Sequence, residues 1–214
     1  MTRPGAGRPA APRRPSHAGA PDTSYRAGVT LAPTADPTTD PATELVVLLT
    51  EDGTPCGTAP KSGVHHRTTP LHLAFSCWIL DDAGRTLLTR RAASKRTWPG
   101  VWTNSFCGHP GPGEEPADAV LRRSVQELGV QVGDVSPLLP SFRYRAVMDD
   151  GTVENEVCPV FTARIAPGEG ELAPDPAEVD AFRWVHLDDL AAQVAADPSP
   201  FSPWMLWQWE QFPR

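Results

Sequence analysis

The sequence has no long apolar run, since no stretch approaches the roughly 18–20 residues that a membrane-spanning helix needs. Basic residues are also in the minority: 19 Lys and Arg stand against 26 Asp and Glu, which gives a formal net charge of −7. A negative chain is not drawn to nucleic acid by bulk electrostatics. We therefore expect neither a membrane nor a nucleic-acid partner.

Cysteine is scarce, with four in the chain (Cys56, Cys77, Cys107 and Cys158) and no C-x-x-C pair among them. With no secretion signal ahead of them, we expect reduced thiols in a cytoplasmic protein rather than a disulfide framework. A length of 214 residues fits one domain, or one domain and a tail. We expect a monomer.

The first 43 residues differ in composition from the rest. They contain eight prolines, five arginines and three aspartates, but almost no large apolar side chains. Such a segment cannot bury enough surface to offset the entropy lost on ordering, so we expect a disordered arm over residues 1–43. The Arg-rich start also suits a transit peptide, although the prolines would interrupt its amphipathic helix. The folded domain is expected over residues 44–214.

Apolar periodicity and turn residues divide this domain into a mixture of strands and helices. Residues 59–70 and 92–113 are expected to be mostly irregular, because Pro and Gly interrupt them. Strands are expected at 44–50, 54–58, 72–80, 85–90, 141–148, 152–164 and 182–185, and helices at 114–128, 187–195 and from 203 onward. This combination predicts an α+β protein built as an α/β/α sandwich.

The helix at 114–128 is the clearest of these predictions. Pro116 suits its first turn, and Gly129 is expected to end it. Arg123 and Glu127 are four residues apart, which by itself predicts a surface ion pair worth a few tenths of a kcal/mol. The last helix is expected to begin with Ser202 as its N-cap. The buried stripe of the 114–128 helix is expected to include Ala119, Val120, Val125 and Leu128.

Several residues have the side chains of a metal site. Glu154 and Glu156 are two apart on an expected strand, so both carboxylates point to one face. On their own, such pairs more often form a solvated strand face. Imidazole suits Zn, Mn and Fe ions, and added carboxylates suit harder ions such as Mn and Mg. The candidate nitrogen ligands are His65 or its neighbour His66, His72 and His109.

Cys107 lies in a glycine-flanked turn, two residues before His109. A thiol beside a metal and a histidine can have its pKa tuned for proton transfer, whereas an isolated buried cysteine is only a small apolar side chain. Tyr144 has a hydroxyl that could relay a proton. A local basic cluster in an acidic protein predicts an anion clamp, although a solvated loop would explain any two members. The cluster comprises Lys61, Arg90, Arg91, Lys95, Arg96, Arg123 and Arg143.

Four segments together resemble a known family. They are Leu71-His-Leu-Ala-Phe-Ser76, residues 89–110 with their T-W-P-G-V-W-T-N and C-G-H-P motifs, residues 142–159, which begin F-R-Y-R and end E-N-E-V-C-P, and Phe201-Ser-Pro-Trp-Met205. They resemble the type I isopentenyl-diphosphate Δ-isomerases of the Nudix superfamily, over roughly residues 44–210. The resemblance implies a Nudix-like α/β/α sandwich with a mixed sheet and added terminal elements. It also implies an isomerase of isoprenoid biosynthesis, which interconverts isopentenyl diphosphate and dimethylallyl diphosphate.

The same resemblance implies roles for individual residues. It implies an Mn²⁺, Zn²⁺ or Mg²⁺ ion held by His65, His72, His109, Glu154 and Glu156, and the spacing to His72 favours His65 over His66. It implies Cys107 and Glu156 as the catalytic pair, with Tyr144 assisting Glu156 and the ring of Trp204 over the substrate. It implies that Lys61, Arg91, Lys95 and Arg123 bind the diphosphate, and that Glu127 helps to hold a second ion, Mg²⁺, with it.

The implied chemistry adds one proton to an unactivated alkene and removes another, through a tertiary carbocation. Glu156 and Tyr144 would supply the proton and Cys107 would remove the other, with the roles exchanged in the reverse direction. The helix departs from the Nudix hydrolase pattern, because Arg123 and Gln126 replace two of its three glutamates. A hydrolase needs several carboxylates to hold the metals that activate water. The alternatives are a Nudix pyrophosphohydrolase and a binding module without catalysis.

Overall fold

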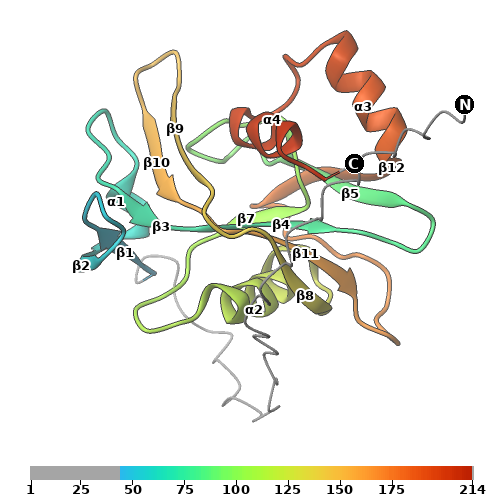
Figure 1. The fold of residues 1–214 in the computed structure, drawn as a ribbon, viewed down its shortest axis with the longest axis horizontal. Helices are drawn as coiled ribbons and strands as arrows, with labels where there is room; N and C mark the ends of the chain where they lie inside the picture. Colours follow the sequence, from blue (N-terminus) through green and yellow to red (C-terminus); the bar gives the residue numbers. More distant parts are fainter. Residues whose placement is uncertain (1–43, 214) are drawn as a thin grey trace, which may run out of the picture. The chain divides into compact units, whose positions relative to one another are not determined.

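The computed structural model of the chain describes residues 44–213 (Figure 1), so the arm expected over residues 1–43 lies outside the described residues. The strands of this part are β1 (Leu45–Leu49), β2 (Pro55–Pro60), β3 (His72–Leu73), β4 (Phe75–Ile79), β5 (Arg85–Arg91), β6 (Trp102–Thr103), β7 (Phe106–Gly108), β8 (Val132–Leu139), β9 (Arg143–Val147), β10 (Val153–Val157), β11 (Val160–Ile165) and β12 (Val179–His186). The helices are α1 (Lys61–Val64), α2 (Pro116–Leu128), α3 (Leu187–Ala196) and α4 (Pro203–Glu210). None of these helices is long and apolar enough to cross a membrane.

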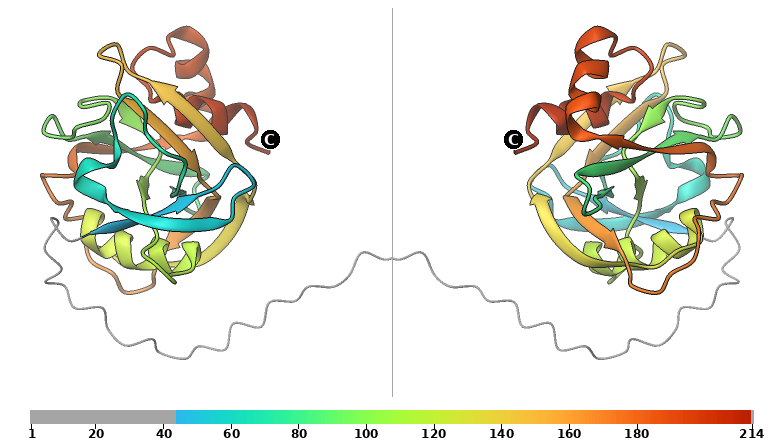
Figure 2. Two further views of the ribbon diagram at one scale, coloured as in Figure 1. Left: turned by 90° about the vertical axis from the view of Figure 1, so that its left-hand side faces the viewer. Right: turned by 90° about the vertical axis from the view of Figure 1, so that its right-hand side faces the viewer.

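The strands form three sheets within residues 44–213, with the orders β2-β1-β3-β10-β9, β7-β4-β11-β8 and β12-β5-β6. Parallel and antiparallel pairs occur together, as the mixed-sheet prediction requires. Helix α2 lies on one side of β4, β7 and β11, and α3 and α4 lie on the other (Figures 1 and 2). The α/β/α arrangement inferred from the sequence is therefore confirmed.

Strand β4 explains how the two helical layers are held. Phe75, Cys77 and Ile79 pack into the apolar cluster that includes α2, while Trp78 packs into the cluster that includes α4. Because side chains alternate across a strand, five consecutive buried residues serve both faces of the sheet. Trp78 also donates from its indole nitrogen to the side-chain oxygen of Gln208 in α4, at 2.8 Å.

Two long predicted strands are each divided in two. The strand expected at 72–80 breaks at Ala74 into β3 and β4, and the strand expected at 152–164 breaks at Cys158-Pro159 into β10 and β11. Proline has no N–H for the ladder, which accounts for the second break. The breaks coincide, since Ala74 N donates to Val157 O at 2.9 Å and Ser76 N to Pro159 O at 3.1 Å. The strand pair thus passes from one sheet into the next at a single point, beside the site described below.

Two local predictions differ from the structure. Residues 59–70 contain the end of β2 and the short helix α1, so they are not mostly irregular. Residues 92–113 are mostly irregular, as predicted, and contain only the short strands β6 and β7. Strand β8 was not predicted because it contains Gly133, Asp134 and Pro137, but it is the edge strand of its sheet, where proline is tolerated.

Helices α2 and α4 can be compared with the predictions for their ends and buried faces. Helix α2 has Pro116 in its first turn and ends at Gly129 with φ 68°, as predicted. Its buried stripe contains Ala119, Val120 and Leu128, but Val125 is 51% exposed. Arg123 and Glu127 take the buried positions instead, so the expectation of a surface ion pair was wrong. Ser202 occupies the N-cap of α4 but makes no capping hydrogen bond, because its hydroxyl pairs with Thr103 at 2.8 Å.

Candidate active site

Strand register brings the reactive residues together. Glu156 on β10 is the parallel partner of His72 on β3 and the antiparallel partner of Tyr144 on β9. Where the chain crosses into the next sheet, Ser76 on β4 is the partner of Cys107 on β7, and His109 follows directly after β7. Residues that are far apart in sequence therefore meet where the two sheets join.

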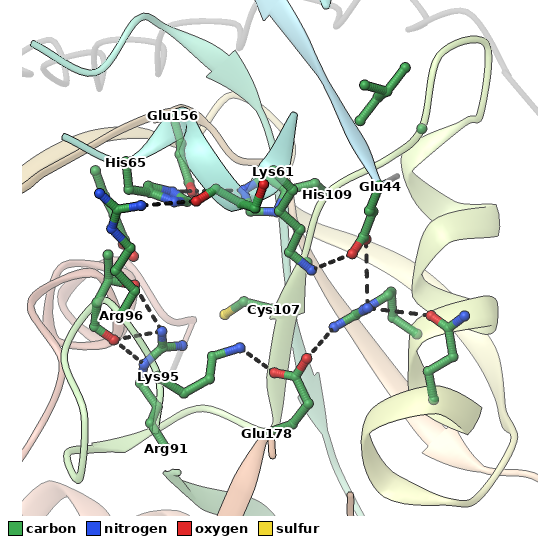
Figure 3. A pocket seen from close by; sticks show the side chains of 18 of the residues that line it. Glu44, Lys61, His65, Arg91, Lys95, Arg96, Cys107, His109, Glu156 and Glu178 are labelled. Atoms are coloured by element: carbon green, nitrogen blue, oxygen red, sulfur yellow. Dashed lines mark hydrogen bonds and ion pairs between the residues drawn. The ribbon is translucent and has the colours of Figure 1, made fainter. Parts of the chain in front are cut away.

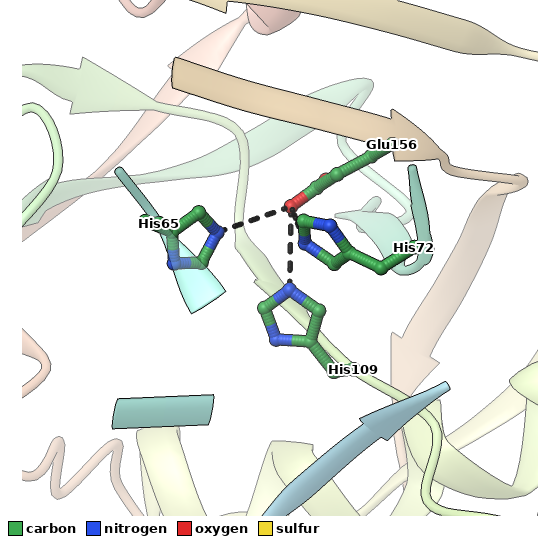
Figure 4. Close-up of side chains that lie close together, drawn as sticks. All are labelled: His65, His72, His109 and Glu156. Atoms are coloured by element: carbon green, nitrogen blue, oxygen red, sulfur yellow. Dashed lines mark hydrogen bonds and ion pairs between the residues drawn. The ribbon is translucent and has the colours of Figure 1, made fainter. Parts of the chain in front are cut away.

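Three histidines converge on one carboxylate oxygen. The Nε2 atoms of His65, His72 and His109 lie 3.8, 3.4 and 3.2 Å from Glu156 Oε1 (Figure 4). The four ligand atoms are all within 4.8 Å of one another and all four side chains are buried. His66, the alternative to His65, points elsewhere and accepts a hydrogen bond from Thr68 N.

This cluster fits a cation better than a hydrogen-bonded core. His72 Nδ1 lies 2.9 Å from the carbonyl oxygen of Pro70, which can only accept, so Nδ1 carries the proton and Nε2 offers a lone pair. The Nε2 atoms of His65 and His72 are buried with no hydrogen-bond partner. Three imidazole nitrogens gathered on one carboxylate oxygen form a donor set for a metal ion.

Electrostatics within the cluster favour the charged carboxylate. Burial alone would raise the pKa of Glu156, but the three histidines hold it well below its usual value. Burial lowers the pKa of His109 from 6.5 to about 3, so this imidazole is neutral. Burial also acts to lower the pKa of His72, but its contacts with Glu156 leave the value above its usual 6.5. An ionised carboxylate beside a neutral imidazole is the state that metal ligation requires.

Glu154, the fifth expected ligand, lies outside the group of four. Its Oε2 is 2.7 Å from the hydroxyl of Tyr144, which is also 2.8 Å from Glu156 Oε2. A phenol has one proton to donate, so the second contact is a hydrogen bond only when a carboxyl group carries a proton. Both glutamates are buried. The two glutamates and Tyr144 therefore form one connected polar unit beside the histidines.

A pocket of about 790 Å³ lies beside this cluster. Cys107 and Glu156 both line it, as do Tyr144, Glu154 and Trp204, and Figure 3 shows the Cys107 thiol directed into it. Helix α4 supplies Trp204, whose ring packs against Tyr144 with 5.9 Å between centroids. The two expected proton carriers thus share one cavity.

The thiol of Cys107 is held by polar neighbours that were not predicted. Its sulfur lies 3.2 Å from Ser76 Oγ and 3.5 Å from Asn104 Oδ1. Asn104 in turn donates to Ser76 Oγ at 2.8 Å, and both residues are fully buried. Burial raises the pKa of Cys107 from 9.0 to about 12, although the hydrogen bond from Ser76 opposes this rise. The thiol therefore carries its proton at neutral pH.

The cations expected to bind diphosphate, Lys61, Arg91, Lys95 and Arg123, all line the same pocket. Arg91 also places its guanidinium carbon 5.3 Å from the centroid of the Trp204 ring. Two members of the predicted cluster lie elsewhere. Arg90 is not part of the pocket lining, and Arg143 pairs with Glu51 at 2.6 Å on the surface.

Carboxylates accompany the pocket cations. Glu127 is buried behind Arg123, with Oε1 2.6 Å from Arg123 Nη2, and burial raises the pKa of Glu127 although Arg123 opposes the rise. Glu44 and Glu178 lie in the pocket wall beside Lys61 and Lys95 (Figure 3). Neither was predicted. A buried cation requires a counter-charge, but no motif in the sequence indicates which of its many acidic residues provides it.

Comparisons with known proteins identify the family of this chain. The NUDIX domain profile matches residues 70–205. An isopentenyl-diphosphate Delta-isomerase of Paenarthrobacter aurescens is 58% identical over 169 residues, which cover 79% of this chain and 90% of that protein. The isomerase of that name from Klebsiella pneumoniae is 50% identical over 163 residues, 76% of this chain and 87% of that protein.

Two solved structures agree in fold. The MutT NUDIX hydrolase from Burkholderia pseudomallei has a TM-score of 0.51 and 26% identity, over 66% of this chain and 97% of that one. The protein DR0079 from Deinococcus radiodurans has a TM-score of 0.55 and 19% identity, over 72% of this chain and 90% of that one. The second likeness concerns the fold alone. With its NUDIX fold and its identity to these relatives over most of its length, the chain belongs to the isopentenyl-diphosphate Delta-isomerase family of NUDIX proteins.

Proposed function

We propose that this protein interconverts isopentenyl diphosphate and dimethylallyl diphosphate by moving a carbon–carbon double bond. One observation carries the proposal: Cys107 and the Glu156–Tyr144 pair line the same pocket as six cationic side chains, which include the four expected to bind diphosphate. The cations suit a diphosphate, and the proton carriers suit the two proton transfers of the reaction. Since one chain provides the whole pocket, the proposed active unit is a monomer. The four free cysteines support a cytoplasmic location.

The reaction adds a proton to the terminal methylene carbon and leaves a tertiary cation on the neighbouring carbon. Loss of a proton from the next carbon then forms the internal double bond, so atoms and charge balance without a co-reactant. We assign these transfers to Cys107 and to Glu156 assisted by Tyr144. In the free protein Cys107 is protonated and Glu156 is ionised. In the free protein Cys107 is thus ready to donate, which reverses the direction expected from the family resemblance, where Glu156 and Tyr144 supply the proton. Cys107 can accept a proton only after substrate binding has changed its protonation.

The walls of the pocket would protect and stabilise the intermediate. The face of the Trp204 ring can attract a cation, by ~2 kcal/mol or more where water is excluded. Its indole ring is 2% exposed and its nitrogen has no hydrogen-bond partner, so water has little access there. A carbocation survives only where no water can attack it. Trp204 therefore acts by placing its ring face toward the carbocation and by keeping water away from it, rather than by transferring a proton.

The donor set fits a divalent ion held by His65, His72, His109 and Glu156. Glu154 is the proposed fifth ligand, and it lies near Glu156 because both carboxylates contact the Tyr144 hydroxyl. When bound, an Mn²⁺, Zn²⁺ or Mg²⁺ ion would supply positive charge that increases the acidity of nearby protons. We further propose that Lys61, Arg91, Lys95 and Arg123 bind the diphosphate. Glu127 would help to hold a Mg²⁺ ion with it.

The test is incubation of the purified protein with isopentenyl diphosphate in deuterated water, with and without chelator. We expect a product of the same composition that carries deuterium, and loss of turnover with chelator. Release of inorganic phosphate from isopentenyl diphosphate or from nucleoside diphosphate derivatives would instead favour the hydrolase. Cys107→Ala and Glu156→Gln should each nearly abolish turnover. Retained turnover in a folded variant would remove that residue from the reaction.

A further inference from the structure

Glu178 holds two of the cations proposed to bind diphosphate. Its carboxylate pairs with Lys95 Nζ, and its Oε1 lies 3.1 Å from Arg123 Nη2. Its backbone is also fixed, because its carbonyl accepts from Ala92 N at 3.0 Å and its N–H donates to the Asp175 carbonyl at 2.9 Å. The carboxylate is therefore held firmly between the loop after β5 and helix α2.

Glu44 has the corresponding position on the other side of Arg123. Its Oε2 lies 2.8 Å from Lys61 Nζ, and its Oε1 lies 3.6 Å from Arg123 Nη1. Cations and carboxylates thus alternate along the pocket wall, with Glu44 beside Lys61 and Glu178 beside Lys95 (Figure 3). Arg91 is the exception, since it donates to the carbonyl and hydroxyl oxygens of Thr97 rather than to a carboxylate of the described residues.

The two carboxylates are charged in the free protein. Burial alone would raise the pKa of Glu178, but Lys95 and Arg123 lower it to about 2. Burial likewise opposes ionisation of Glu44, and Lys61 and Arg123 hold its pKa below the usual value. The positive charges of Lys61, Lys95 and Arg123 are therefore largely compensated within the protein before any ligand arrives.

We propose that Glu178, together with Glu44, is an internal counter-ion against which a phosphate ligand competes for the pocket cations. The inference rests on the proposed function, because it takes the ligand to be a diphosphate. An entering anion meets the repulsion of two fixed carboxylates as well as the attraction of the cations. A free anion therefore binds weakly. A diphosphate that brings a divalent cation binds well, because the cation offsets the two carboxylates.

A purely structural role for Glu178 predicts the opposite change in anion affinity when the carboxylate is removed. If the carboxylate only positioned Lys95 and Arg123, its loss would release both side chains and weaken anion binding. If it competes with the anion, its loss strengthens metal-free binding. Glu178→Gln keeps the size of the side chain and one acceptor oxygen while removing its charge, so it separates the two roles.

The experiment is calorimetric titration of the purified protein with inorganic pyrophosphate, in chelator and then in excess Mg²⁺. Without metal, Glu178→Gln and Glu44→Gln should each bind pyrophosphate roughly tenfold more tightly than the wild type, a size typical of one charged contact. The advantage should shrink in Mg²⁺. Glu171→Gln is the matched control, since it removes a charge from an exposed residue that does not line the pocket.

Unchanged or weaker metal-free binding in the pocket variants would overturn the inference. Circular dichroism should confirm that each variant is folded. If one variant fails to fold, the other shows whether the affinity for pyrophosphate rises or falls. The isomerase assay on the same wild-type preparation keeps the two proposals separate. Turnover with unshifted pyrophosphate binding refutes the counter-ion role alone, whereas the expected binding shift without turnover refutes the isomerase assignment alone.

Discussion

The thiol of Cys107 should react slowly with an alkylating reagent even though it faces a pocket. Its pKa of about 12, against a usual 9.0, follows mainly from burial. A rise of this size leaves about 1000-fold less thiolate near pH 8. The remaining thiolate is intrinsically more nucleophilic, by about 20-fold for a Brønsted coefficient of about 0.45. The expected result is alkylation about 50-fold slower than for a thiol of usual pKa.

Cys56 provides a comparison within the same molecule, because it is exposed. The metal-free protein would be treated with iodoacetamide at pH 8, and the labelled peptides would be followed over time by mass spectrometry. Cys56 should be labelled first, and Cys107 only after a long delay. In guanidinium chloride both cysteines should react at similar rates, since burial is then lost. This control separates protonation in the fold from any local sequence effect.

A substitution sharpens the same experiment. The carboxylate of Glu156 contributes to the raised pKa of Cys107, so Glu156→Gln should lower that pKa and increase the labelling rate. The wild-type result bears directly on the mechanism. Labelling of Cys107 as fast as Cys56 in the folded protein would mean that the thiol is already ionised there. The reasoning from burial would then be refuted, and Cys107 would begin the reaction as a base.

Three further predictions concern stability. Acidification of the metal-free protein from pH 6.5 to 4 should lower its free energy of unfolding, measured in urea. His109 contributes up to about 3 kcal/mol of this loss, because its pKa is about 3 in the fold and it gains its proton only on unfolding. Equal stability at both pH values would contradict this. Gly129→Ala should cost about 2 kcal/mol or more in urea unfolding, because φ is +68° and the new Cβ would lie 2.5 Å from the Ala173 carbonyl oxygen. Gly133→Ala has open space and should not; similar losses would refute the steric argument. Added Mn²⁺ should raise the Tm of chelator-treated protein but not of His72→Ala, and an equal rise in both would exclude His72 as a ligand.

The sequence predicted most of the local structure because local structure depends on neighbouring residues. Pro116 and Gly129 defined α2 through backbone rules that hold in any context. Val125 was assigned wrongly because apolar periodicity assumes that the buried face of a helix is apolar. Here that face borders a pocket and carries Arg123 and Glu127. The error therefore marks the part of the helix that lies beside the pocket.

The candidate site depended on long-range pairing, which spacing alone does not supply. The two-residue spacing of Glu154 and Glu156 indicated one strand face, but the meeting of Glu156 with His72 requires the parallel pairing of β3 and β10. The family motifs supplied that information. Glu44 and Glu178 belong to no such motif, and Glu178 directly precedes β12, whose pairing with β5 places it beside Ala92.

Helix α4 has a consequence for how the protein is made. It contributes Trp204 to the pocket wall and Gln208 to the hydrogen bond with Trp78, and it follows every other described helix and strand in the chain. A ribosome therefore synthesises this wall after the histidines and glutamates of the cluster. The strands that carry these ligands are therefore available for pairing before the residues that close the pocket wall have been made.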